Sequence, residues 1–459
     1  MGSLAFYMLV DFAVISVSIM GSYKLYRLLE IGKEVFYPKW GIMPVSLVVA
    51  AGTVGMMYLM QAYRRQSSLL NMEEIKAVFK GVSLSFLLLA LILMLGRIEL
   101  SRYVQVFSYI FCLLAVVVER SILYHVMPSL RHIRGFRKQV LIYGAGELGS
   151  ALFREMTNSP RLGKVVVGFV DDDPEKAGAV HCSSGFSKFS CTASVLGTRE
   201  DIGRLIQEHH IDEIYLAISN IGNSTCTEIL NFLKQFSVRT RFVPNLYKLF
   251  MHRVRMGHIG QIPVVEELDA SLPAVYLKVK RAIDALVSAG ALILLSPLFA
   301  MIGAAIRLDT KGPVFFRQKR VGLNGALFDI YKFRSMRTDA DPYAVNPLDP
   351  RDGRVTRVGR FLRKTSLDEL PQLINVLKGD MSLVGPRPEM PFIVETYKEI
   401  HRERLKVLPG ITGLWQLSGD RKLAIHENMD YDLYYIRNIS FSLDVAILLE
   451  TLLFAFRGI

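Results

Sequence analysis

The 459-residue sequence has few cysteines and no clustered histidines, which argues against two common kinds of site. Its four cysteines form no CxxC pair, and Cys112 lies in an apolar run, so neither a disulfide framework nor a zinc site is indicated. The nine histidines form no HxxxH or comparable metal-binding pair. The N-terminus lacks the basic start and small-residue cleavage site of a signal peptide, so we expect its first apolar segment to stay attached.

Acidic residues are fewer than basic residues. Lysine and arginine number 55 against 42 acids, which gives a net charge of +13, and the mean hydropathy is +0.30. A chain that is both basic and apolar suggests a membrane facing acidic lipids, or phosphorylated substrates. The basic residues lie beside apolar segments and in one C-terminal stretch, with no recognisable nucleic-acid module. We therefore expect membrane lipids, and no nucleic acid, among the partners.

Four apolar stretches occupy residues 1–130. They run from Leu4 to Tyr26, Gly41 to Tyr63, Lys76 to Leu95 and Tyr103 to His125, each near the roughly 20 residues that cross a bilayer as a helix. Basic residues flank the second loop and follow the fourth stretch: Arg64, Arg65, Lys76, Lys80, Arg131, Arg134, Arg137 and Lys138. Because such residues favour the cytoplasmic side, we predict four transmembrane helices with everything after residue 130 in the cytoplasm.

A soluble α/β pattern follows. The stretch "QVLIYGAGELG" is a short apolar strand that runs into Gly144, Gly146 and Gly149, and "VVVGFVDDD" is a second strand that ends in Asp171. This spacing is typical of a dinucleotide-binding fold, in which the acid binds ribose. Further strands at "EIYLAI" and "VRTRFVP" predict a Rossmann-like domain over residues 139–260. The four named residues are candidates for nucleotide binding. The same glycines also serve strand-to-helix packing, and we favour that interpretation over bound NAD or another nucleotide.

A fifth apolar segment, residues 280–308, follows a linker over 261–277. Basic residues flank both of its ends, which places both ends on the cytoplasmic side. Ser296 and Pro297 lie at its centre, where a proline removes a backbone donor and a serine hydroxyl can satisfy a freed carbonyl. We predict a re-entrant helix that bends there and leaves by the face it entered. The alternative, an ordinary fifth crossing with a tolerated proline, would place the basic C-terminal region outside the cell.

Two adjacent acids stand out in "TSLDELPQLINVLKGDMSLVGPRP", residues 365–388. Asp368 and Glu369 precede an apolar helical pattern, and Pro371 is tolerated only in a first turn, so we expect the pair at a helix N-terminus. Acids there commonly cap a helix and interact with its dipole. On this stretch alone, capping is the favoured interpretation.

The surrounding cations favour a reactive site. Lys332 and Arg334 lie in "KFRSMR", Arg363 lies just before the acids, and Arg387 lies between two prolines. A helix N-terminus and nearby cations keep a carboxylate ionised, as a nucleophile or metal ligand. Such cations also hold phosphates, so the set suits displacement at a phosphoryl group.

These motifs carry a resemblance to a known family. The run from "GPVFFRQKRVG" through "YKFRSMR", "LRKTSLDELPQLINVLKGDMSLVGPRPE" and "LPGITGLWQ" resembles the monotopic phosphoglycosyl transferases, also called bacterial sugar transferases or polyprenyl-phosphate glycosyl-1-phosphate transferases. The resemblance covers about residues 275–459. Four helices followed by a Rossmann-like domain resemble the large, exopolysaccharide-initiating branch of that family.

The resemblance implies a function and a site. Members transfer a sugar-1-phosphate from a UDP-sugar to a polyprenyl phosphate such as undecaprenyl phosphate, release UMP, use Mg²⁺, and catalyse the first membrane step of glycan assembly at the bacterial inner membrane. Asp368 would be the nucleophile that forms a covalent phosphosugar intermediate, and Glu369 would help bind the metal. Lys332, Arg334, Arg363 and Arg387 match phosphate-binding positions, and Ser296 and Pro297 match the break in the family's re-entrant helix. The implied architecture is a membrane protein of mixed class: a transmembrane four-helix bundle, an α/β Rossmann-like cytoplasmic domain, and a mainly α catalytic domain over residues 278–459.

Several alternatives stay open at this point. Asp432 suits a position behind the site or a substrate contact, although capping and surface roles explain it as well. A membrane-anchored NAD-dependent nucleotide-sugar dehydratase or epimerase would need a Tyr-x-x-x-Lys pair, and Tyr276 with Lys280 has that spacing. A non-catalytic scaffold for polysaccharide assembly is a third candidate. A homodimer is also among the expected partners.

Overall fold

The computed structural model describes residues 2–30, 39–63, 72–97, 100–126, 138–158, 164–183, 191–219, 222–244, 254–260, 262–267, 274–341, 352–417 and 429–455. The chain divides into two compact units, Met1–Leu268 and Asp269–Ile459. Five arginines used above to predict orientation lie outside the described residues: Arg64, Arg65, Arg131, Arg134 and Arg137.

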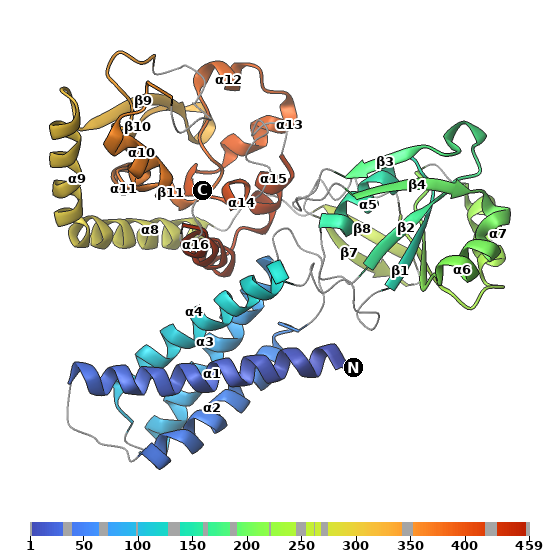
Figure 1. The fold of residues 1–459 in the computed structure, drawn as a ribbon, viewed down its shortest axis with the longest axis horizontal. Helices are drawn as coiled ribbons and strands as arrows, with labels where there is room; N and C mark the ends of the chain where they lie inside the picture. Colours follow the sequence, from blue (N-terminus) through green and yellow to red (C-terminus); the bar gives the residue numbers. More distant parts are fainter. Residues whose placement is uncertain are drawn as a thin grey trace. The chain divides into compact units, whose positions relative to one another are not determined.

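The first unit begins with a bundle of long helices (Figure 1). They are α1 (Gly2–Leu29), α2 (Lys39–Leu59), α3 (Met72–Leu95) and α4 (Arg102–Val126). All four are long and apolar enough to cross a membrane, which confirms the four predicted membrane helices. Helix α1 packs against α2 and α4, and α3 packs against the same two helices.

Polar contacts connect the helices of this bundle. The hydroxyls of Ser22 in α1 and Ser108 in α4 lie 2.6 Å apart. Arg120 in α4 donates to the fully buried carboxylate of Asp11 in α1 at 2.5 Å. Between α2 and α3, a side chain at Gly81 would lie only 2.9 Å from Met57, so the two backbones approach closely. Small residues and interhelical hydrogen bonds of this kind drive helix association where the surrounding solvent is as apolar as the side chains.

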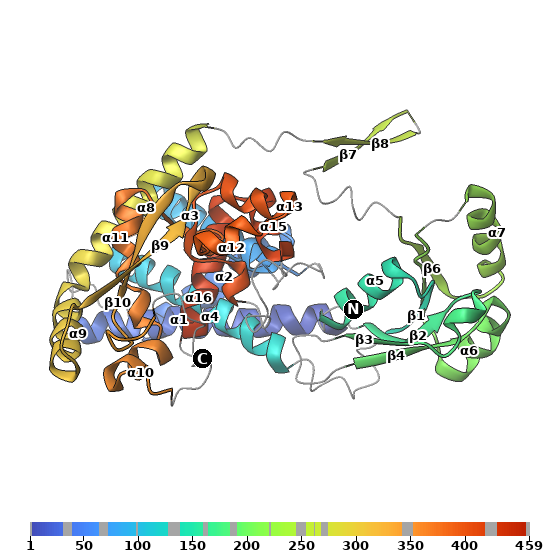
Figure 2. The ribbon, with the colours of Figure 1, turned by 90° about the horizontal axis from the view of Figure 1, so that it is seen from above.

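A six-stranded sheet follows in the order β3-β4-β2-β1-β5-β6 (Figures 1 and 2). Its elements are β1 (Lys138–Tyr143), α5 (Glu147–Asn158), β2 (Lys164–Val170), β3 (Val180–Ser183), β4 (Cys191–Gly197), α6 (Ile202–His209), β5 (Glu213–Leu216), α7 (Asn223–Leu233) and β6 (Arg239–Phe242), with short 3-10 turns η5 (Pro174–Lys176) and η6 (Arg199–Asp201). All neighbouring strands pair in parallel except the edge strand β3, which runs antiparallel to β4. The predicted parallel α/β domain is thus confirmed.

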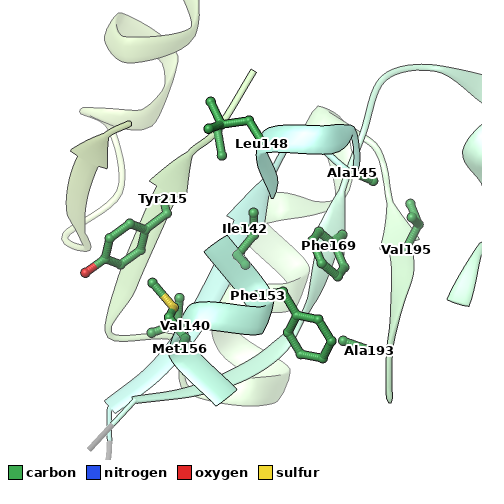
Figure 3. Packing of buried hydrophobic residues seen from close by; sticks show 11 residues of the cluster. Val140, Ile142, Ala145, Leu148, Phe153, Met156, Phe169, Ala193, Val195 and Tyr215 are labelled. Atoms are coloured by element: carbon green, nitrogen blue, oxygen red, sulfur yellow. The ribbon is translucent and has the colours of Figure 1, made fainter. Parts of the chain in front are cut away.

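Both faces of this sheet are covered by helices. Alternate residues of β1 point to opposite sides, so Val140 and Ile142 pack with Phe153 of α5 on one face, while Leu141 and Tyr143 join a second core that includes residues of α6 and α7. Figure 3 shows the first cluster, with the hydroxyl of Tyr215 pointing away from the packed side chains. Burial on two sides explains why the strand reads as a continuous apolar run in the sequence.

An antiparallel hairpin follows the sheet and is not part of it. Strands β7 (Val254–Ile259) and β8 (Ile262–Glu267) pair only with each other among the described residues. The hairpin crosses residue 260, where we predicted the α/β domain to end, and β8 occupies part of the predicted linker. Alternation within one short segment does not reveal which partner strand it will choose.

The second unit is mainly helical, with two small sheets. It contains α8 (Ala274–Leu294), α9 (Ser296–Asp309), β9 (Phe315–Val321), η8 (Leu323–Gly325), β10 (Leu327–Phe333), α10 (Arg357–Lys364), η9 (Leu367–Glu369), α11 (Gln372–Lys378), β11 (Ser382–Val384), α12 (Pro391–Glu395), α13 (Glu399–Arg402), η10 (Glu403–Lys406), β12 (Gly410–Thr412), α14 (Leu414–Leu417), α15 (Met429–Asn438) and α16 (Phe441–Ala455). Strand β9 pairs with β10 in an antiparallel hairpin, and β11 pairs in parallel with β12.

Helices α8 and α9 form a bent pair, visible in Figure 1 as a sharp turn in the chain. Their axes differ by 61° across the break at residue 295. The Ser296 hydroxyl donates to the carbonyl of Ile293 at 2.8 Å, and Pro297 lies in the first turn of α9. A proline there loses no helical hydrogen bond, because the first amides of a helix have no partner within it.

The last helix, α16, belongs to the core of the second unit. Leu443, Ala446 and Ile447 are fully buried, and the Thr451 hydroxyl lies 2.7 Å from that of Thr412. Trp415 of α14 is also buried, at 8% exposure.

Candidate active site

The acid pair lies in a 3-10 turn, η9, rather than in the first turn of a helix. Ser366 precedes this turn with a left-handed backbone (φ 54°), and Leu370 and Pro371 separate the turn from α11. The sequence prediction placed the acids at the start of the helix; the structure moves them one short turn ahead of it. Helix α11 has only seven residues, so its dipole contributes little at this distance.

Apolar residues on both sides of the acids fix the turn. Leu367 and Leu370 pack against a buried core made by Ile302 and Ile306 of α9, with Phe333 of β10 and Leu362 of α10. Helix α8 holds the far end of α11, because Arg281 donates to the carbonyls of Val376 and, at 2.8 Å, Leu377. Both helices of the bent pair therefore support the segment that carries Asp368 and Glu369.

Glu369 is held by two cations. Its Oε1 accepts hydrogen bonds from Lys332 Nζ at 2.7 Å and from Arg387 at 2.9 Å, and its side chain is 20% exposed. Burial alone would raise the pKa of Glu369, but the charges of Arg387 and Lys332 outweigh it and hold that pKa well below its usual range. This carboxylate therefore stays ionised at neutral and mildly acidic pH.

Asp368 behaves differently from its neighbour. Burial raises the pKa of Asp368 to about 6; Glu369 adds to the rise, while Lys332, Arg363 and Arg387 oppose it. We had expected cations and the helix dipole to keep the pKa of this acid low. Desolvation is the larger effect, so Asp368 titrates just below neutral pH. A carboxylate that is ionised at pH 7 yet poorly solvated is a better nucleophile than one stabilised by a tight ion pair.

Of the four predicted phosphate-binding residues, Lys332 and Arg387 contact Glu369 directly. Arg363, in the last turn of α10, lies close enough to lower the pKa of Asp368. Arg334 is oriented elsewhere. Its buried guanidinium donates to the carbonyls of Thr310, at 2.7 Å, and Lys311, at 3.0 Å, and so holds the chain after α9. A phosphate-binding role for Arg334 stays a prediction.

The loop that carries Arg387 is held at every carbonyl from residue 386 to 389. The carbonyl of Pro386 accepts from the backbone of Gly410 at 2.9 Å, and that of Glu389 from the backbone of Val321 at 3.0 Å. Between them, Arg404 donates to the carbonyl of Arg387 at 2.9 Å, and Arg320 donates to that of Pro388 at 3.2 Å. Fixing four consecutive carbonyls leaves the backbone little freedom, and the flanking prolines restrict it further.

Arg404, which the sequence reasoning missed, is the centre of a buried ionic group. Its Nε lies 2.6 Å from Asp432 Oδ2, and its guanidinium also donates to the Tyr397 hydroxyl. Arg404 and Asp432 each have side chains only 2% exposed. Asp432 therefore lies behind the site, connected to Glu369 through Arg404 and Arg387. No local pattern around Arg404 marks it, because its partners come from distant parts of the chain.

A small pocket opens beside Lys332 and Arg387. Its other lining residues are Arg320, Ile330, Gln372, Pro388, Gly410, Ile411 and Gln416. The basic residues on this wall suit a phosphate group, and the amide side chains can hydrogen-bond to a polar substrate.

The residues present fit a magnesium ion only in part. The described part of the chain contains no group of three or more His, Cys, Asp or Glu side chains placed to hold a metal. Mg²⁺ is commonly held by one or two carboxylates together with substrate phosphates and water. Glu369 and Asp368 can supply such carboxylates, so the donor set fits a metal that arrives with a phosphorylated substrate.

The candidate nucleotide-binding residues lie together after β1 and β2. Gly144 has φ 111°, and a side chain at Gly149 would collide with the carbonyl of Gly144. Asp171 accepts from the backbone of Ala145 at 2.7 Å and from that of Asp173 at 3.0 Å. The Asp171 carboxylate thus holds the glycine-rich loop, and nucleotide binding by these four residues stays a prediction.

The Tyr-x-x-x-Lys pair lies on α8, in the second unit. Lys280 Nζ is 2.6 Å from Asp444 and 3.8 Å from Asp284. Two carboxylates thus hold the ammonium group of Lys280, which the dehydratase alternative would need as a catalytic group.

Comparison with known proteins agrees with this arrangement. Residues 275–458 match the family model described as bacterial sugar transferase, and residues 59–244 match a model described as a CoA-binding domain. A UDP-glucose:undecaprenyl-phosphate glucose-1-phosphate transferase from Klebsiella pneumoniae is 32% identical over 84% of this chain and 82% of its own. The protein of the same description from Escherichia coli (strain K12) is 33% identical over 71% of this chain and 68% of its own. A UDP-N-acetylgalactosamine-undecaprenyl-phosphate N-acetylgalactosaminephosphotransferase from Aeromonas hydrophila is 40% identical over 44% of this chain and 48% of its own.

The two family models together match residues 59–244 and 275–458, and the Klebsiella pneumoniae relative matches 84% of the chain. The chain therefore belongs to the bacterial sugar transferase family and is a phosphotransferase enzyme.

Proposed function

We propose that this protein transfers a sugar-1-phosphate from a UDP-sugar to undecaprenyl phosphate through a covalent intermediate on Asp368. The observation that carries the proposal is the contrast between two adjacent carboxylates. Glu369 is fixed by Lys332 and Arg387, whereas burial gives Asp368 a pKa of about 6. The fixed carboxylate suits charge and metal binding, and the poorly solvated one suits attack.

The reaction proceeds in two balanced steps. The Asp368 carboxylate attacks the phosphorus next to the sugar, the bond to the bridging diphosphate oxygen breaks, and UMP leaves with that oxygen. A phosphate oxygen of undecaprenyl phosphate then attacks the same phosphorus and displaces the Asp368 carboxylate. Lys332, Arg363 and Arg387 neutralise charge on the phosphoryl oxygens in both steps.

Glu369 would bind Mg²⁺ jointly with the diphosphate of the substrate. When bound, this ion would neutralise the charge that develops on the leaving UMP. Glu369 needs no proton exchange for this role, because Arg387 and Lys332 keep its pKa low.

The bent pair α8 and α9 would enter the bacterial inner membrane and leave by its cytoplasmic face. Exposed apolar side chains cover this pair, including Leu286, Ile293, Leu294 and Met301. The same pair supports the acid turn through Arg281 and the core around Ile306. This arrangement would hold the acids at the interface, where a soluble UDP-sugar and a lipid phosphate can both reach Asp368.

The proposal is tested by incubating purified protein with a panel of UDP-sugars, Mg²⁺ and undecaprenyl phosphate, and measuring UMP and lipid product. We expect Mg²⁺-dependent UMP release with at least one sugar, and a loss on the order of a thousandfold or more in Asp368→Asn. Asp339→Asn is the matched control, because Asp339 is 71% exposed and lies outside the site. Normal turnover in Asp368→Asn would contradict the covalent mechanism.

A further inference from the structure

A second group of basic residues lies on the α/β domain, far in sequence from the acid pair. Its centre is Glu213, the first residue of β5, whose side chain is only 1% exposed. Lys138 lies 2.6 Å from this carboxylate and Lys164 3.1 Å, while Arg241 lies 3.4 Å and Arg239 3.9 Å from it. We call these four cations, from β1, β2 and β6, the basic edge.

The basic edge lies at the amino ends of the parallel strands, as the register shows. Lys138 pairs with Lys164, and Glu213 pairs with Arg239. Burial would raise the pKa of Glu213, but hydrogen bonds from Lys138 and Lys164 outweigh it and lower that pKa to about 2. Glu213 therefore stays ionised and holds the charged ends of Lys138 and Lys164 and the guanidinium groups of the two arginines close together.

The four cations outnumber the acids beside them. Glu213 and its neighbour Asp212, which accepts from the backbone of Gln139 at 2.7 Å, supply two negative charges against four positive ones. Three of the cations extend to solvent, with side-chain exposures of 44% for Lys138, 64% for Arg239 and 47% for Arg241. Figure 3 shows the hydroxyl of Tyr215, a neighbour of Lys164, directed away from the core.

The opposite end of the same sheet is acidic. The segments that follow the carboxyl ends of β1, β2 and β4 carry seven acids: Glu147, Asp171, Asp172, Asp173, Glu175, Glu200 and Asp201. Lys176 and Arg199 lie among them, and Arg204 of α6 pairs with Asp201 at 3.0 Å. The domain is therefore electrically polar along its strands, with positive charge concentrated where the chain enters it.

That entry point is tethered to a membrane helix. Helix α4 ends at Val126 and β1 begins at Lys138. The residues between them can bridge at most about 40 Å. Residues 127–137 add Arg131, Arg134 and Arg137 to the sequence between them. A tether of this length lets the positive surface reach a membrane that contains acidic lipids, whose potential extends about one Debye length from the headgroups.

We propose that the basic edge is a docking surface for the anionic phospholipid headgroups of the membrane that α1–α4 span. The α/β domain would lie with the amino ends of its strands against the headgroups and its acidic end toward solution. This inference does not depend on the proposed transfer reaction, because none of its residues belongs to the second unit.

The test uses the full-length protein in nanodiscs made of phosphatidylcholine alone, or of phosphatidylcholine with phosphatidylglycerol. An amine-reactive reagent and mass spectrometry then give the labelling rate of Lys138, with Lys176 at the acidic end as internal reference; their exposures are similar, 44% and 38%. We expect phosphatidylglycerol to slow the labelling of Lys138 by about fivefold or more, relative to Lys176. About 0.5 M salt should remove most of this protection.

Two variants that lower the net charge by the same amount distinguish docking by the basic edge from a general effect of net charge. Arg239→Gln with Arg241→Gln leaves Lys138 and Lys164 on Glu213, and should abolish the lipid-dependent protection without lowering Tm. Arg204→Glu alters an arginine of α6 that is 54% exposed and should leave the protection intact.

The proposal is wrong if Lys138 labels equally in both lipids, or if the two variants behave alike. Protection that is independent of lipid charge but rises with the number of chains per disc would indicate a contact between copies, and would also overturn it.

Discussion

At the scale of single residues, the site depends on the different surroundings of Asp368 and Glu369. Both are carboxylates in one short turn, yet burial dominates the pKa of Asp368 while two cations dominate that of Glu369. Adjacent acids with divergent pKa values can take different chemical roles. Three predictions follow from this difference.

The pH dependence of transfer should follow Asp368. Its carboxylate must be ionised to attack, and its pKa in the folded protein is about 6. We expect kcat/KM to rise with pH through about 6 and then level off, with no second acidic transition from Glu369. A profile that is flat from pH 5 to 8 would contradict the assignment of Asp368 as nucleophile.

Removing a neighbouring cation should shift that profile. Lys332 lowers the pKa of Asp368 and also binds Glu369, so Lys332→Gln should move the acidic limb from about 6 toward 7, as well as lower the rate. Lys319→Gln, in a lysine of β9 that is 53% exposed and paired with Asp329, should leave the limb in place. An unshifted limb in Lys332→Gln would contradict the electrostatic account.

The Asp368→Asn variant should be more stable than the native protein at pH 7. The folded pKa of about 6 lies above the ordinary value of 3.8, so ionisation destabilises the fold as the pH rises from about 4 through 6. The amide avoids that cost, which we put at about 1–2 kcal/mol after allowing for partial exposure. Thermal unfolding in detergent should show a raised Tm at pH 7 and little difference at pH 4. A Tm at pH 7 below that of the native protein would contradict the assigned burial cost.

At the scale of secondary-structure elements, the site depends on the way distant segments hold two short loops. The loop with Arg387 is bound at four carbonyls, and Arg404 supplies one of those contacts from within a buried pair with Asp432. Removing one partner of a buried ion pair leaves the other charge uncompensated.

Asp432→Asn should therefore impair both stability and turnover. We expect a loss of about 3–5 kcal/mol of stability, and a fall in kcat larger than the change in KM because Arg387 loses its support. Glu403→Gln is the control, since Glu403 pairs with Lys406 at the surface and should cost under about 0.5 kcal/mol. An Asp432→Asn protein that keeps its Tm and kcat would show that the pair does not position Arg387.

The packing of α10 allows a second test at this scale. A Cβ at Gly359 would lie 1.9 Å from the carbonyl oxygen of Ser335, whereas one at Gly353 would meet nothing within 4 Å. Gly359→Ala should force α10 away, displace Arg363, and cost about 1–3 kcal/mol. Gly353→Ala should be nearly neutral. Equal Tm values for the two variants would contradict this packing.

Some elements were predictable from sequence and others were not, for physical reasons. The membrane helices were found to within a few residues because bilayer thickness fixes their length, and β1 was found because burial on both faces makes it uniformly apolar. The turn at Asp368 was not predicted, because it depends on the left-handed backbone of Ser366. The pKa of Asp368 was misjudged because the packing of its turn against α9, α10 and β10 is not visible in the local sequence. Arg404 was missed for the same reason.

At the scale of the whole molecule, the residues proposed for transfer and the membrane helices lie in different units. Every residue assigned to transfer lies between Asp269 and Ile459, while the first unit contains the four membrane helices and the α/β domain. Polar groups buried in a membrane bundle are costly and usually paired, as Asp11 and Arg120 are.

Disrupting that pair should therefore leave the chemistry intact. We expect Arg120→Met to lower the Tm of the bundle, because Asp11 keeps a buried charge without its closest partner. The kcat of the folded fraction should remain within about twofold of native. A large loss of kcat in protein that remains folded would show that the membrane bundle takes part in transfer.

The central claim is that Asp368 carries the sugar phosphate between donor and acceptor. The most direct measurement is the intact mass of the protein after mixing with Mg²⁺ and the UDP-sugar it uses, with no polyprenyl phosphate present. We predict a mass increase of one sugar phosphate, one UMP released for each active site, localisation of the added mass to Asp368 by peptide mapping, and no adduct in Asp368→Asn. UMP release that requires both substrates together, with no adduct in the native protein, would contradict the covalent mechanism.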